Sequence, residues 1–225
     1  LKYSIMASIL KVDKIRVSGG DSDSISFDGS GNITIPKNVT FNGTGGGTKI
    51  LLSDVNVSSA VASVEFVHGT GGVIFDSTYS RYELTVDRAV PSTNSERLEL
   101  LISTNAGSSY FGDSQYNLVV KRFYTNGSDT ADDVAYYNDF IATHRQTSHN
   151  NANRGGANGT VLISSMGQVN RTVAYGNFWG FGQSYYIHSH TVGAVESNGD
   201  DMTGVKWQFG SGNISSGRFK LYGIK

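Results

Sequence analysis

The sharpest pair of chemically capable side chains is His188 and His190, which are separated by one residue in the stretch SYYIHSHTV. In a β-strand, residues i and i+2 point to the same face, so both imidazoles would project together. Two imidazoles suit a transition metal, and three chains about an axis would supply six ring nitrogens. The alternative is two polar residues on the wet side of a strand whose inner face holds Tyr185 and Ile187. We therefore predict no metal and no cofactor, and keep His188 and His190 as the candidate metal ligands.

Aromatic residues are concentrated among glycines in the stretch GNFWGFGQSYY at 176–186. Exposed aromatic rings stack on sugar faces, and Trp and Tyr often anchor protein interfaces. The alternative is packing in the core, although the flanking glycines also suit a surface loop. The candidate contact residues for a receptor or glycan are Phe178, Trp179, Phe181, Tyr185 and Tyr186.

Motifs for catalysis are missing from the sequence. It has no cysteine nucleophile, no G-x-S-x-G elbow, no P-loop lysine and no H-E-x-x-H. Asp132 with Asp133 and Asp200 with Asp201 could suggest glycoside hydrolysis, but adjacent acids on a polar turn are usually solvated. A depolymerising enzyme would also need a longer solenoid and a deep acidic groove. We predict no catalytic residue and no enzymatic activity.

Composition narrows the class of protein. The 225 residues carry a net charge of −1, so nothing indicates binding to nucleic acid, which needs basic clustering. No apolar run approaches the ~18 residues of a membrane span, so no membrane insertion is expected. The absence of cysteine fits synthesis in a reducing cytosol. With 28 glycines, well above the usual ~7%, and many β-branched residues, the chain has a turn-rich β composition.

Residues 49–225 read as a series of strands with turn residues between them. In YSRYELTVDRAV, Tyr82, Leu84 and Val86 fall on one face and charged or polar residues on the other, which is typical of a half-buried strand. About eight to ten such strands follow one another without β–helix–β alternation. The pattern predicts an all-β, antiparallel two-sheet sandwich of jelly-roll type as a head domain. One stretch, DTADDVAYYNDFIATH at 129–144, has helical spacing and suits a short helix or an ordered loop.

Residues 1–48 differ from the rest. Very short apolar pairs, such as Ile25 with Phe27 and Ile33 with Ile35, stand between Gly, Ser, Asp and Asn. Strands this small cannot bury a face alone, but they become stable when several chains wrap together. The alternative is a flexible arm. We predict an N-terminal docking or trimerising arm, joined to the head by the glycines 45–47.

Several stretches resemble bacteriophage virion proteins of the fibre-like or decoration type. The start MASILKVDKIRV, the short-strand segment SFDGSGNITIPKNVTFNGTG, and the hairpins of residues 77–110 carry the resemblance. In the second hairpin the turn is Asn105-Ala106-Gly107, where the family has a Ser-Thr-Asp-Gly-Gly type of turn. The closing SGNISSGRFKLYGIK is the most specific match. Residues 125–160 contribute nothing to it.

The resemblance implies a non-enzymatic structural subunit of a phage particle. Such a subunit is trimeric, is attached through its N-terminal arm to tail or capsid proteins, and is located in the virion after synthesis in the host cytoplasm. The alternative function is a receptor- or glycan-binding module at the tip of a tail fibre, with a host surface glycan as partner. In some trimeric tail fibres, repeated His-x-His pairs bind iron, whereas this chain has one such pair.

The last strand is a further prediction. Phe219 and Leu221 alternate with Arg218 and Lys220, so we expect the first two to face the core and to close the fold. In a sandwich a closing strand can pair on both sides, and its loss would expose two ladder edges.

Overall fold

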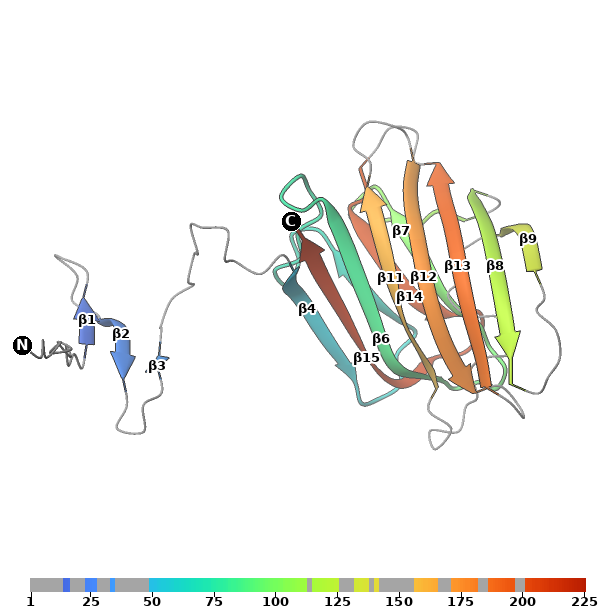
Figure 1. Ribbon diagram of the computed structural model, residues 1–225, viewed down its shortest axis with the longest axis horizontal. Helices are drawn as coiled ribbons and strands as arrows, with labels where there is room; N and C mark the ends of the chain where they lie inside the picture. Colours follow the sequence, from blue (N-terminus) through green and yellow to red (C-terminus); the bar gives the residue numbers. More distant parts are fainter. Residues whose placement is uncertain are drawn as a thin grey trace, which may run out of the picture. The chain divides into compact units, whose positions relative to one another are not determined.

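A computed structural model gives the fold (Figure 1). It describes residues 14–16, 23–27, 33–34, 49–112, 115–125, 132–137, 140–141, 156–165, 171–181, 186–196 and 201–225. The chain divides into two units, Leu1–Gly47 and Thr48–Lys225, which are the arm and the head. The glycines 45–47 lie outside the described residues.

Three short strands are described in the arm. They are β1 (Lys14–Arg16), β2 (Asp23–Phe27) and β3 (Ile33–Thr34), paired antiparallel in the order β1-β2-β3. Strands were expected around Ile25 with Phe27 and around Ile33, and they are present there. Ile35, which forms the second predicted pair with Ile33, lies outside the described residues.

The head is an antiparallel two-sheet sandwich, as the strand pattern predicts. Ten strands form its two sheets, and β9 and β10 add one strand to the edge of each. The large sheet has the order β4-β15-β6-β11-β12-β13-β8-β9 and the small sheet the order β10-β7-β14-β5. The bounds in the large sheet are β4 (Lys49–Val57), β6 (Arg81–Pro91), β8 (Tyr116–Tyr124), β9 (Asp132–Tyr137), β11 (Ala157–Ser165), β12 (Arg171–Phe181), β13 (Tyr186–Glu196) and β15 (Ile214–Ile224). Those in the small sheet are β5 (Ser63–Val67), β7 (Leu98–Ser103), β10 (Phe140–Ile141) and β14 (Gly204–Phe209).

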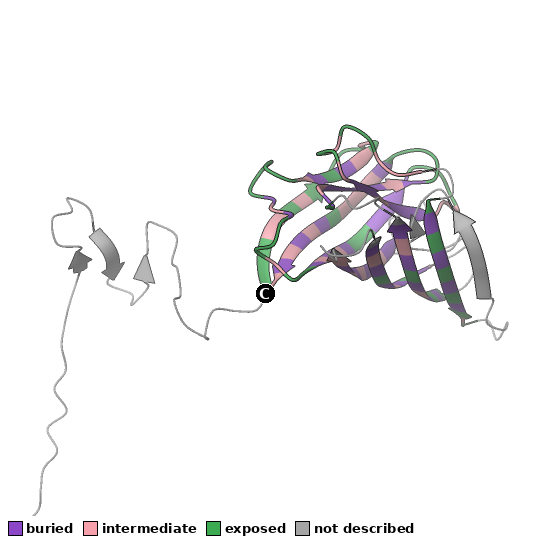
Figure 2. Cartoon of the chain, turned by 90° about the horizontal axis from the view of Figure 1, so that it is seen from above, coloured by how far each residue is buried: buried purple, intermediate pink, exposed green. Residues whose placement is uncertain are grey.

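Alternation builds the core between the two sheets. Buried and exposed residues follow one another as stripes along the large sheet (Figure 2). Tyr82, Leu84 and Val86 of β6 are buried, which confirms the predicted inner face of that strand. Trp207 of β14 is fully buried and packs against Phe178 and Phe219 of the large sheet, at ring-centroid distances of 6.2 and 6.3 Å. Aromatic packing therefore joins the two sheets.

The closing strand β15 pairs with β4 on one side and β6 on the other. Phe219 and Leu221 are fully buried, on the side that the alternation predicts. Arg218 points outward and binds the carboxylate of Asp54 through Nε and Nη2, at 2.8 and 2.6 Å. The C-terminal strand is thus an interior strand of the large sheet.

The described residues of the stretch 129–144 form neither the short helix nor the ordered loop that were its two interpretations. Its described residues form β9, which pairs with β8, and β10, which pairs with β7. Strand pairing at two sheet edges satisfies backbone groups that a short helix would leave unpaired at its ends, so tertiary pairing overrides the helical spacing. Within the described part of the chain, no helix is long and apolar enough to cross a membrane.

Candidate interaction face

Phe178 was a candidate contact residue, and the structure corrects this. It is fully buried, and its ring occupies space that two glycines leave free. A Cβ at Gly159 would lie 2.4 Å from Cδ1 of Phe178, and one at Gly176 would lie 2.6 Å from Cε2. The glycines around Phe178 therefore make room for an aromatic core residue, and do not form a surface loop.

The aromatic neighbours of Phe178 in β12 and β13 lie on the opposite, outer side of the sheet. Trp179 is 52% exposed and Tyr186 is 62% exposed. Phe181 is half-buried because its ring packs edge-on against Tyr186, with 4.8 Å between centroids. Tyr185 lies outside the described residues. Three of the five candidates are thus available on one surface.

His188 and His190 lie on that same outer side, with their ring centroids 4.5 Å apart. Partial burial lowers the pKa of His188, and the neighbouring His190 lowers it further. The ring of Phe123 stacks on His188 at 6.0 Å and meets His190 edge-on at 5.7 Å. Among the residues that the structure describes, no three His, Cys, Asp or Glu side chains are gathered as a metal site would require.

Strand pairing places these residues in three straight rows across β12, β13 and β8. Trp179, His188 and Phe123 form the first row. Asn177, His190 and Lys121 form the second, and Tyr175, Val192 and Val119 form the third. Successive residues of one strand on one face belong to successive rows, so the three rows make one continuous surface.

We call this surface the aromatic face. It is the outer side of β12, β13 and β8 at Val119, Lys121, Phe123, Tyr175, Asn177, Trp179, Phe181, Tyr186, His188, His190 and Val192. Apolar and aromatic side chains occupy most of its positions. Lys121 is its one permanent cation, and it includes no carboxylate.

The outer side of the same sheet over β4, β15 and β6 has the opposite character. Arg218 pairs with Asp54 there, and Nζ of Lys49 lies 2.5 Å from Oε1 of Glu83. The hydrogen bond from Arg218 lowers the pKa of the Asp54 carboxyl. These exposed, mutually paired charges are typical of a solvated surface. One sheet thus has a charged half and an apolar half.

Sequence reasoning missed Phe123, Val119, Tyr175 and Val192 on the aromatic face. In YNLVVKRFY, both alternating sets of residues contain apolar side chains, so the pattern does not tell the inner face from the outer one. The signal that was available is the excess of apolar residues in this strand. A strand with one solvent-exposed face should be polar at every second position, and β8 is not.

One cavity of about 300 Å³ opens elsewhere on the head. Tyr79, Tyr82, Asp76 and Asp201 are among its lining residues. Tyr82 is committed to structure, because its hydroxyl accepts a hydrogen bond from the Asp76 amide and donates one to the Asp76 carbonyl. Hydrogen bonding to the Thr78 side chain, and then to the Thr78 amide at 2.8 Å, lowers the pKa of the Asp76 carboxyl. Asp200, which was considered with Asp201 as a pair of carboxylates for glycoside hydrolysis, lies outside the described residues.

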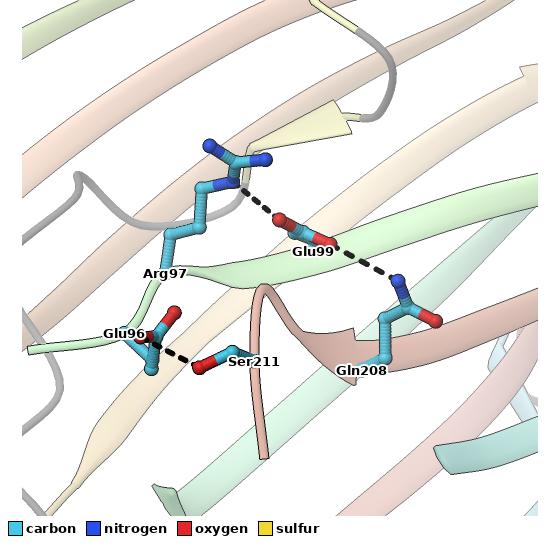
Figure 3. A network of polar contacts seen from close by, with 5 residues as sticks. All are labelled: Glu96, Arg97, Glu99, Gln208 and Ser211. Carbon is cyan, nitrogen blue, oxygen red and sulfur yellow. Dashed lines mark hydrogen bonds and ion pairs between the residues drawn. The ribbon is translucent and has the colours of Figure 1, made fainter. Parts of the chain in front are cut away.

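A buried carboxylate at Glu99 is also structural. Glu99 of β7 is paired with Arg97 and accepts a hydrogen bond at 3.1 Å from Nε2 of Gln208 on the adjacent β14, as Figure 3 shows. Ser211 donates to Glu96 beside it at 2.9 Å. Both oxygens of Glu99 are engaged within the head, so this cluster links β7 to β14.

Comparison with known proteins adds no relative. A scan of protein-family models, a search of curated proteins and a search of solved structures each find no match to this chain. Chemically, the aromatic face offers apolar area, stacking surfaces and two imidazoles. This composition is suited to binding a macromolecule by burial.

Proposed function

We propose that this chain is a non-enzymatic structural subunit of a bacteriophage particle. It forms a homotrimer, docks through its arm on tail or capsid proteins, and carries the sandwich as a head. The observation that carries the assembly part of this proposal is the aromatic face, because a contiguous exposed apolar patch of this kind often marks an interaction site. The sequence resemblance to phage virion proteins, whose most specific match includes the strand β15, supports the phage assignment.

Labelling the particle tests this proposal directly. Antibody against the head, carried on gold, should decorate purified particles of the phage that encodes the chain, at symmetric positions on the tail or the capsid. Particles that never bind the antibody, although infected cells contain the chain, would show that it is not a virion component.

A second candidate function is recognition of a host receptor or glycan. Trp179, Tyr175 and Tyr186 favour it, because their exposed rings could stack on sugar faces. Trp179→Ala should then abolish adsorption to host cells while the head stays folded. Adsorption at the unmodified rate would eliminate this candidate and leave the structural role in place.

A further inference from the structure

We propose that the aromatic face is the surface by which three copies of this chain pack around a common axis. The β12 side of each copy packs against the β8 side of the next, and β13 faces the axis. This inference rests on the proposed trimeric subunit and deepens it, because it assigns the contact surface and the residue rows that meet.

Area is the first argument. Tyr175, Phe123, Trp179 and Tyr186 are 44, 39, 52 and 62% exposed. At roughly 150–250 Å² for each aromatic side chain, these four expose on the order of 400 Å². Val119 and Val192, both 47% exposed, and the two imidazoles extend this surface. An apolar patch of several hundred Å² is of the size that marks interaction sites on proteins. Around a threefold axis it is divided between two neighbouring copies, so each contact also includes polar residues at the rim of the face.

Chemistry selects the occupant. A nucleic acid would need several cations, and the face has Lys121 alone beside two histidines of which His188 resists protonation. A polysaccharide needs carboxylates or amides for its many hydroxyl groups, and the face offers one amide, Asn177. Another copy of the same face supplies the matching apolar surface. We therefore assign the occupant as the same chain.

The rows fit head-to-tail contact in a closed ring. Around a threefold axis, each copy presents its β12 side to the β8 side of its neighbour. Trp179 then meets Phe123 of the next copy, and Tyr175 meets Val119, so that aromatic groups pack against apolar ones. In the middle row Asn177 of one copy lies opposite Lys121 of the next, so this row places two polar positions against each other. Two of the three rows are thus apolar on both sides of the contact, and the third is polar on both sides.

An engineered disulfide tests this arrangement, because the native chain has no cysteine. Asn177 and Lys121 both pair with His190, so they lie two strands apart. That is about 10 Å within one chain, beyond the ~7 Å limit between Cα atoms for a disulfide. A bond between positions 177 and 121 must therefore join two chains. The full chain carrying Asn177→Cys and Lys121→Cys is oxidised and run on a denaturing gel without reductant.

We expect a covalent ladder that ends at the trimer and collapses to monomer with reductant. Each single variant should stay monomeric on the gel. The matched control is Asp54→Cys with Thr85→Cys, which has the same two-strand spacing around Lys220 on the charged half of the sheet. It should give no ladder. Circular dichroism and a thermal melt confirm that each variant is folded.

Three results would overturn the inference. A ladder that ends at the dimer would show face-to-face pairing without a threefold axis. If no cross-link forms while light scattering reports a trimer, the aromatic face is not the contact, and the proposed trimeric subunit stands on another surface. A native chain that is monomeric by light scattering at micromolar concentration would remove both the inference and the trimer.

Discussion

Phe178 and Trp179 are neighbours in β12 with opposite surroundings. Phe178 fills a space between the two sheets, over Gly159 and Gly176, whereas Trp179 stands on the outer face beside His188. Phe178 therefore contributes to the stability of the fold, whereas Trp179 is placed to contact a partner.

Phe178→Ala should lower the free energy of unfolding by about 3–5 kcal/mol, because it removes a buried ring and leaves a cavity. Trp179→Ala should change it by less than about 0.5 kcal/mol, as is usual for an exposed position. Chemical denaturation of the two variants, compared with the native chain, measures both effects. Equal losses would show that Trp179 is part of the core.

Gly223 makes a close contact near the C-terminus. A Cβ there would lie 2.5 Å from Cγ of Tyr79, whose ring packs edge-on against Tyr82 at 6.0 Å. Gly223→Ala must displace Tyr79 and should lower stability by about 1–3 kcal/mol. Repeating the substitution in a Tyr79→Ala background is the control, because the clash is then gone. The same loss in both backgrounds would exclude the ring as the cause.

The pH response of the aromatic face centres on His188. Its pKa is lowered from the ordinary 6.5 by burial first and by His190 second. Phe123 faces His188 from β8, Lys121 faces His190, and β12 contributes no titratable group to these rows other than Tyr175. Folding thus favours neutral His188. The contribution of His188 to the free energy of unfolding is complete above pH 6.5. It is lost as the pH falls from 6.5 through the lower pKa that His188 has in the folded state.

An NMR titration of the imidazole protons should place the midpoint of His188 below 6.5. In His190→Gln the midpoint should rise part of the way toward 6.5, since burial, the larger cause, remains. A midpoint at or above 6.5 in the native chain would contradict this account of the face.

At the scale of elements, β15 stabilises the large sheet from within. It supplies Phe219 and Leu221 to the core and forms ladders with β4 and β6 at once. A sheet that loses an interior strand exposes two unpaired edges, which promotes aggregation.

Deleting residues 217–225 should therefore abolish soluble folded protein. Soluble yield and the β-sheet signal in circular dichroism measure this. Lys220→Ala, which changes an outward side chain in the same strand, should leave both unchanged. A soluble, folded truncation would show that β4 and β6 can close the sheet without β15.

Particular elements show what sequence could predict. The alternation in β6 and β15 predicted their inner faces, because each has one polar side. The stretch that forms β9 was ambiguous, since its strand character comes from pairing with β8, a distant partner in sequence. About half of the residues of the aromatic face could not be assigned to the outer side from sequence, for a related reason. Phe123 and Val119 resemble core residues until the register with β13 shows which side they occupy.

At the scale of the whole molecule, the chain combines a unit of short strands with a sandwich whose large sheet is divided into a charged and an apolar half. The strands of the arm, two to five residues long, cannot bury a face alone. The apolar half of the large sheet exposes aromatic and aliphatic side chains that a partner could cover. The proposed association of several copies would account for both features.

The mass of the full chain in solution tests this account most directly. Light scattering coupled to size exclusion at micromolar concentration and pH 7.5 should give about 72 kDa, three times the 24.1 kDa of one chain. A single species near 24 kDa over that concentration range would contradict the trimer on which the proposed function depends.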